Sequence, residues 1–237
     1  GKGVATSHTT VDKSKEAVPT ISVDYGFFTK DHDEAMPMLV SKDRQSGMIQ
    51  ARIVPKKGVE KYAVKRLGAD IDLLGYKRIV LKSDGEPAIV ALKQGVKGQN
   101  LQDIILEESP KGDSKANGEI ENAIKRVAAQ FRTQKEAAES RYERRIPQTH
   151  HIVPWMVSNA AATMNRFQVG IDGKTSHERW KGKRFIKTIA EFGECIQGLL
   201  LGSARTQKHL SRWIDGIYLG VRDEIAEVIL GTKDGVI

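Results

Sequence analysis

The stretch Pro19-Thr-Ile-Ser-Val-Asp-Tyr-Gly-Phe-Phe28 is an apolar run that contains a single acid, Asp24. Its β-branched and aromatic residues predict a buried strand. A second apolar run, Arg78-Ile-Val-Leu-Lys-Ser-Asp84, ends on another acid. A carboxylate inside or at the end of a buried strand costs free energy unless something pairs with it. The sequence offers these acids no matching buried base, so we expect them to belong to a functional site.

A third acid, Glu121, lies in the first turn of a long predicted helix that follows Asn117-Gly118. Hard divalent cations prefer oxygen ligands, so Asp24, Asp84 and Glu121 together predict a metal site. Phosphoryl transfer by two metal ions needs carboxylates on rigid elements, which hold the cations about 3.5–4 Å apart. Each acid also has an ordinary alternative, as a turn residue at a strand end or as a complement to the helix dipole. The combination of strand, strand and helix favours catalysis.

The order of the predicted elements indicates a mixed α/β sheet with flanking helices. The strand-like runs cover residues 20–29, 36–41, 48–54, 79–81 and 104–106. The helical patterns cover residues 58–74, 86–96, 118–144 and 154–167. The first three strands are joined by short turns, which is typical of an antiparallel meander. This order is that of ribonuclease-H-like folds, so we expect a five-stranded sheet of that class.

Changes in polarity, periodicity and charge along the sequence predict four segments. Residues 1–17 are polar and aperiodic, and we expect a flexible lead-in there. The ribonuclease-H-like core then covers residues 18–168, and a basic linker covers 169–192. The strand-like runs that follow are separated by Gly and charged turns, which suits a small β-rich module at 193–237. We expect this module to be truncated at the end of the sequence.

Composition narrows the possible partners and the compartment. A net charge of +8 and a pI near 9.5 favour a polyanion, with nucleic acid ahead of an anionic membrane. No apolar run approaches the roughly 18 residues that cross a bilayer, and the N-terminus lacks a signal-peptide pattern. The single cysteine, Cys195, excludes an internal disulfide and a Cys-rich zinc site, and suits a reducing compartment. We therefore expect an intracellular protein.

Asp24, Asp84 and the segment Asn117-Gly-Glu-Ile-Glu121 resemble the catalytic core of retroviral and retrotransposon integrases. In that family about 35 residues separate the second Asp from the Glu, and the Glu lies three after a glycine. Asp84 and Glu121 have 36 residues between them, whereas Glu119 would leave 34. Glu121 is preferred because it lies three after the glycine.

Further segments resemble copia-type elements. Gly173-Lys-Thr-Ser-His-Glu-Arg-Trp180 is similar to their Gly-Lys-Thr-Pro-Tyr-Glu segment, and Glu191-Phe-Gly193 to their Phe-Gly turn. Gly216-Ile-Tyr-Leu-Gly220 is similar to their Gly-Ile-Phe-Leu-Gly strand. The chain thus resembles the integrase region of a copia-type LTR retrotransposon polyprotein. Two features depart from the family. No residues of this sequence form the upstream His-His-Cys-Cys zinc module, which was either cut off or never present in this fragment, and Ile124 stands where an Asn is frequent.

The resemblance implies 3′-end processing followed by DNA strand transfer at an Asp-Asp-Glu site. It implies two Mg²⁺ ions, with Mn²⁺ as a substitute, and DNA as the partner, both as element ends and as target. It further implies a homo-oligomer without a membrane role, which acts in the nucleus and is found in the cytoplasm during particle assembly. A ribonuclease-H-type nuclease is the enzymatic alternative and would need a further site carboxylate. A decayed transposon remnant that only binds nucleic acid is the other alternative.

Basic residues near the acids are candidates for DNA contacts. Lys125 lies four residues after Glu121 on the same helix face, where it would reach a phosphate or pair with Glu121 itself. The loop before the helix and the basic segment after the core offer further candidates, and a solvated loop or linker is the alternative for each. The full set of DNA-binding candidates is Lys111, Lys115, Asn117, Lys125, Arg132, Lys181, Lys183 and Arg184.

Overall fold

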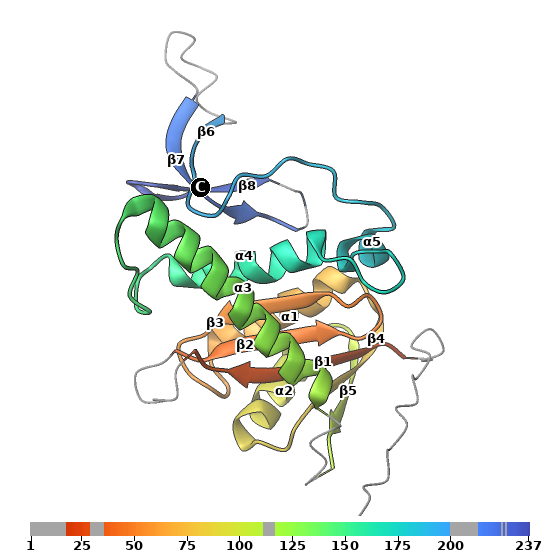
Figure 1. Cartoon of the computed structure of the whole chain (residues 1–237). Coiled ribbons are helices and arrows are strands. Elements are labelled where there is room, and N and C mark those ends of the chain that lie inside the picture. Colours follow the sequence, from red (N-terminus) through yellow and green to blue (C-terminus); the bar gives the residue numbers. More distant parts are fainter. Residues whose placement is uncertain (1–17, 29–35, 111–116, 200–212, 224, 226) are drawn as a thin grey trace, which may run out of the picture.

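The five-stranded sheet is the centre of the fold (Figure 1). The computed structural model describes residues 18–28, 36–110, 117–199, 213–223, 225 and 227–237. The strands are β1 (Thr20–Gly26), β2 (Met38–Asp43), β3 (Ile49–Ile53), β4 (Arg78–Ser83) and β5 (Asp103–Glu108). They lie in the order β3-β2-β1-β4-β5, with β1, β2 and β3 antiparallel and β1, β4 and β5 parallel. The predicted ribonuclease-H-like class is confirmed.

Two helices cover each face of this sheet. The four are α1 (Lys61–Leu74), α2 (Pro87–Gln99), α3 (Gly118–Tyr142) and α4 (Val153–Phe167). Helices α1 and α2 pack on the face that Val23 and Tyr25 of β1 share, and α3 and α4 form the core of the other face. Because successive strand residues point to opposite faces, Asp24 lies on the α3 side of the sheet. The helix–sheet layers therefore bring one predicted acid toward the helix that carries another.

Local sequence signals explain where the helices begin and end. The Glu60 side chain accepts a hydrogen bond from Ala63 N (3.0 Å) and caps α1, which ends at Gly75 with φ 75°. Pro87 opens α2, where its missing N–H costs nothing. The expected helix at 58–74 is therefore present, but it begins at Lys61.

A second sheet follows the core. It contains β6 (Cys195–Leu199), β7 (Trp213–Val221), β8 (Val228–Thr232) and β9 (Gly235–Val236), all antiparallel and in sequence order. The basic segment expected as a linker contains a short helix, α5 (Ser176–Lys181), which a capping box of Thr175 and Glu178 begins. Residues 1–17, expected as a flexible lead-in, lie outside the described residues. Among the helices of the described part, none is long and apolar enough to cross a membrane.

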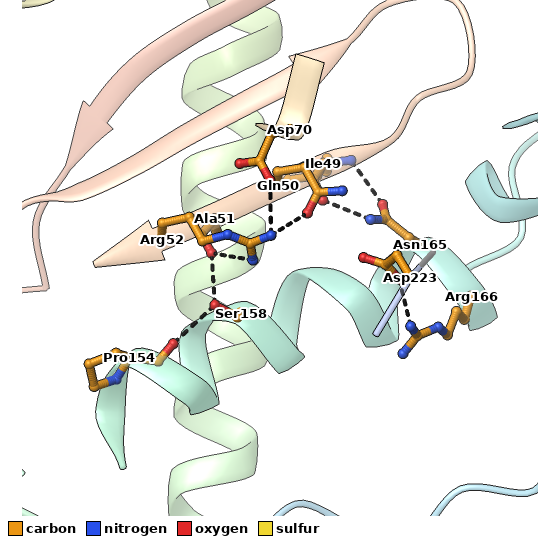
Figure 2. Close-up of polar contacts among 10 residues, drawn as sticks. All are labelled: Ile49, Gln50, Ala51, Arg52, Asp70, Pro154, Ser158, Asn165, Arg166 and Asp223. Carbon is orange, nitrogen blue, oxygen red and sulfur yellow. Dashed lines mark hydrogen bonds and ion pairs between the residues drawn. The ribbon is translucent and has the colours of Figure 1, made fainter. Parts of the chain in front are cut away.

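Helix α4 joins the two sheets (Figure 1). On one side it covers the edge strand β3: Asn165 Nδ2 donates to Ile49 O (2.7 Å), and Ile49 N donates to Asn165 Oδ1 (2.9 Å) (Figure 2). These bonds satisfy backbone groups that an open edge would expose. On the other side, Leu219 of β7 packs into the same hydrophobic core. The C-terminal sheet therefore shares its core with the first domain.

Candidate active site

Asp24 and Asp84 lie on neighbouring parallel strands. In the β1–β4 ladder Ser22 pairs with Lys82, and both acids lie two residues further on. Asp24 is near the end of β1, and Asp84 follows β4 directly. The sequence predicts a strand around each acid, but it does not contain the register that sets them side by side. The structure brings these two predicted residues together at one end of the sheet.

A third carboxylate joins them. The carboxylate oxygens of Asp24, Asp84 and Glu86 all lie within 4.8 Å of one another, and all three residues are half-buried. Glu86 N donates to Asp84 Oδ1 (3.1 Å), and Tyr25 N donates to Asp24 Oδ1 (2.7 Å), so backbone groups orient both aspartates. Glu86 is not among the acids that the sequence predicts for the site. Its signal is the position two residues after Asp84, at the cap of α2.

The three carboxylates of the cluster carry more negative charge than the positive groups near them compensate. Burial, together with the nearby carboxylates of Asp84 and Glu86, raises the pKa of Asp24 to about 6, although the Tyr25 N–H and Lys57 act in the opposite direction. An all-oxygen donor set with surplus negative charge suits a hard divalent cation. Asp24, Asp84 and Glu86 therefore fit such an ion.

Two lysines stand near the acids, so the expectation that no base matches them is wrong. Lys57 Nζ lies 2.7 Å from Glu86 Oε1, and it is 5.4 Å and 5.0 Å from the ring centroids of Tyr25 and Phe27. Lys93 is fully buried, and its Nζ donates to Glu107 O (2.6 Å). Burial lowers the pKa of Lys93, and the charges of Glu108, Asp84 and Glu107 oppose that shift. Helix and loop positions far along the chain supply both bases, which the strand sequences alone do not reveal.

Glu121 is exposed in the first turn of α3 and is not a member of the described cluster. A series of hydrogen bonds nevertheless ties this turn to the end of β4. Ser109 N donates to Ser83 O (2.8 Å), Ser109 Oγ to Asn117 Oδ1 (2.5 Å), and Glu121 N to Asn117 O (3.1 Å). Helix α3 also passes close over β1, because a Cβ on Gly26 would lie 2.6 Å from Ile124 Cγ2. The role of Glu121 as a ligand stays a prediction.

Glu119, the alternative third acid, has a different environment. Its Oε2 lies 3.5 Å from Arg44 Nε, in an ion pair with the turn that follows β2. Arg44 N donates to Thr20 O (2.9 Å), so Arg44 lies at the beginning of β1 and not at the end that carries Asp24. This pair gives Glu119 a structural role of its own.

The candidates for DNA contacts fall into two exposed groups. Lys125 and Arg132 are exposed on α3. At α5, Lys181 Nζ lies 3.8 Å from the ring centroid of Trp180, Lys183 is exposed, and Arg184 Nε lies 3.0 Å from Glu178 Oε1. Asn117 is half-buried and bonded to Ser109, so its side chain organises the turn. Lys111 and Lys115 lie outside the described residues.

Three solved structures with a similar fold come from retroviral integrases. One match is the simian T-cell lymphotropic virus intasome in complex with the PP2A regulatory subunit B56 gamma, with 16% identity, 92% of this chain and 75% of that chain covered, and a TM-score of 0.52. Another match is the catalytic core domain of BIV integrase, with 16% identity, 69% of this chain and 93% of that chain covered, and a TM-score of 0.45. A third is the HTLV-2 integrase catalytic core domain in complex with magnesium, with 16% identity, 68% of this chain and 95% of that chain covered, and a TM-score of 0.48. Neither a family model nor a curated protein matches the sequence. The chain thus has the ribonuclease-H-like fold of integrase cores, and at this identity the likeness concerns the fold alone.

Proposed function

We propose that the chain is the integrase of a copia-type LTR retrotransposon, a metal-dependent polynucleotidyl transferase that processes 3′ ends and transfers DNA strands. The observation that carries the proposal is that the parallel register of β1 and β4 brings the carboxylates of Asp24 and Asp84 together at one end of a ribonuclease-H-like sheet. The ordinary alternative for each acid, a turn or cap residue, does not account for three carboxylates held within 4.8 Å. Such a cluster is costly without a cation.

The residues of the site have separate roles in this proposal. Asp24 and Asp84 would hold one divalent ion, and Asp24 and Glu121 would hold a second, with Mg²⁺ as the physiological ion and Mn²⁺ as a substitute. When bound, the ions supply activation of the attacking oxygen and stabilisation of the leaving oxygen. Glu119 is engaged by Arg44, which supports Glu121 as the third ligand. Glu86 and Lys57 form a neighbouring ion pair that partly neutralises the cluster before the ions bind.

The DNA partners follow from the position of the basic residues. Lys125 and Arg132 continue along α3 from Glu121, so they would bind the phosphates of an element end that enters the acid site. The exposed group of Lys181, Lys183 and Arg184 would bind a more distant part of the duplex. We also propose that the protein works as a homo-oligomer, in the nucleus during integration and in the cytoplasm during particle assembly.

A strand-transfer assay with labelled duplex ends and a target plasmid tests this function. In Mg²⁺ or Mn²⁺, Asp24→Asn, Asp84→Asn and Glu121→Gln should each reduce joining by at least about 100-fold, because each removes a charge that holds an ion. Two matched controls make the same chemical change outside the site. Glu119→Gln removes the carboxylate that pairs with Arg44, and Asp103→Asn removes the carboxylate that pairs with Arg78. Loss of joining in Glu119→Gln with full activity in Glu121→Gln would show that the third acid is assigned wrongly.

Glu86 favours one other function. A ribonuclease-H-type nuclease needs a further site carboxylate, and Glu86 lies where such a group would contact an ion. In that case the protein cleaves the RNA of an RNA–DNA hybrid without joining strands, and Glu86→Gln abolishes cleavage. DNA binding without any activity that depends on a divalent cation would instead indicate a decayed element.

A further inference from the structure

A hollow of about 760 Å³ lies at the edge of the first sheet, where β3, α1, α4 and the end of β7 meet. Several residues around it are drawn in Figure 2, including Arg52, Ser158 and Asp223. Strand β3 is separated from β1 by β2, so the hollow is distinct from the acid cluster. Nothing in the proposed function uses it.

Arginines dominate the charge of this hollow. Arg52 of β3, Arg66 of α1 and Arg222 after β7 all line it. Arg52 Nη2 lies 2.9 Å from Asp70 Oδ1, and the lining acid Asp223 is engaged by another arginine, Arg166 (2.5 Å). Among the described residues that line the hollow or pair with its lining, four guanidinium groups thus meet two carboxylates. The excess is two positive charges, which attracts an anion.

Polar atoms around the hollow also lack partners. Within the part of the chain that the structure describes, Arg52 Nε, Arg66 Nε and Asn159 Oδ1 are buried and have no hydrogen-bond partner. Asn159 is only 5% exposed and belongs to the lining. Buried polar groups are nearly always bonded in native proteins, either to protein or to a bound species. Two donors and one acceptor beside this hollow are therefore unsatisfied, and a small shift of their side chains would let a ligand or ordered water bind them.

The wall opposite Asn159 is a glycine. Gly220 has φ +137°, and a Cβ there would lie 3.1 Å from Asn159 Oδ1. Any other residue would be strained at this φ and would fill the space beside the unpartnered oxygen. Apart from Ser158 and Asp223, the rest of the lining is mostly apolar and aromatic, with Tyr62, Trp155 and Leu219 among it. The hollow thus combines a cationic side with an apolar side.

We propose that this hollow binds a phosphorylated organic anion of nucleotide size. The guanidinium groups of Arg52, Arg66 and Arg222 would hold the phosphate, since their planar forks match its oxygens. The base or another flat group would lie against Trp155, and one of its N–H groups would donate to Asn159 Oδ1. The volume lies within the range of known small-molecule sites. The phosphate belongs either to a free nucleotide or to an unpaired nucleotide at a strand end.

Two probes separate these sources: dAMP and a short oligo(dT) with a 5′ phosphate. Binding to the full chain is measured in EDTA by calorimetry and by quenching of tryptophan fluorescence, to which Trp155 contributes. EDTA keeps the result independent of any metal bound at the acid cluster. Saturable binding of dAMP assigns the site to free nucleotides. If the oligonucleotide binds more tightly than dAMP, the site is assigned to strand ends.

The decisive variant is Arg66→Gln combined with Arg222→Gln, which leaves the pair of Arg52 with Asp70 intact. It should weaken binding of the preferred probe at least about tenfold, because two of three phosphate contacts are lost. Arg78→Gln, at an exposed position at the beginning of β4, is the matched control and should change binding less than twofold. A second variant, Asn159→Ala, should weaken dAMP but not inorganic phosphate. No saturable binding of either probe, or equal binding in the double variant, would mean that water fills the hollow and would overturn the proposal.

Discussion

Replacing Asp24 by Asn should make the metal-free protein more stable, although the residue belongs to the proposed site. Burial and the charges of Asp84 and Glu86 raise the pKa of the Asp24 carboxyl from 3.8 to about 6. Its ionised form is therefore unfavourable in the folded protein. Asn removes that charge, and its amide oxygen still accepts from Tyr25 N, as Asp24 Oδ1 does now (2.7 Å). The substitution relieves a cost and keeps the local backbone contact.

The size of the effect follows from the shift. A change in pKa from 3.8 to about 6 corresponds to about 3 kcal/mol between the charged and neutral carboxyl. The side chain is partly open to water, so solvent screening reduces this to about 1–2 kcal/mol. Because the folded pKa is the higher one, the neutral carboxyl stabilises the fold at low pH, and this stability is lost as the pH rises from about 4 through about 6. The advantage of the Asp24→Asn variant over the wild type should therefore be full at pH 8 and small at pH 4.

Urea unfolding in EDTA at both pH values measures the effect. Asp24→Asn should raise the free energy of unfolding by about 1–2 kcal/mol at pH 8. Asp103→Asn is the matched control, because Asp103 is exposed at the beginning of β5, at the opposite end of the strands. With Mn²⁺ at 100 times its Kd the wild type should gain about 2.7 kcal/mol, and Asp24→Asn should gain much less. Equal stabilities at pH 8 in EDTA, or a loss in the variant, would refute the reasoning.

Three further substitutions test other contacts. Lys57→Met should tighten Mn²⁺ binding about two- to fivefold in calorimetry, because it removes a cation from the acid cluster; weaker binding would contradict this role. Gly26→Ala should lower the rate of strand joining about tenfold or more by displacing α3, and Ile124→Ala should restore it if the 2.6 Å approach is the cause. Asn165→Leu should cost about 2–4 kcal/mol in urea unfolding, because the N–H and C=O of Ile49 both lose their partner, and an unchanged midpoint would show that water replaces them.

The sequence predicts the order of elements well because local patterns determine it. The apolar runs around Asp24 and Asp84 form adjacent strands, and every predicted helix of the core is present within a few residues. Helix α5 shows a missed local signal, since the capping box of Thr175 and Glu178 was available in the sequence. The basic composition of this segment instead favours a linker.

Local sequence patterns do not show which distant segments come into contact in the fold. Glu86 joins the acids because α2 starts immediately beyond β4, and Lys57 reaches Glu86 across 29 residues of sequence. Its ammonium lies over the rings of Tyr25 and Phe27, which only the fold of the β3–α1 connection produces. The arginine-lined hollow likewise exists only because the C-terminal sheet packs on α4. Such sites depend on register and packing rather than on periodicity.

The most direct test is to locate Mn²⁺ in crystals of the full chain by anomalous scattering. We predict one ion between the carboxylates of Asp24 and Asp84 and a second between Asp24 and Glu121, with the second ion absent in Glu121→Gln. We also predict that Asp24→Asn crystals hold neither ion. Crystals soaked in Mn²⁺ that show no ion at Asp24 and Asp84 would contradict the central claim that this pair of acids is a metal site.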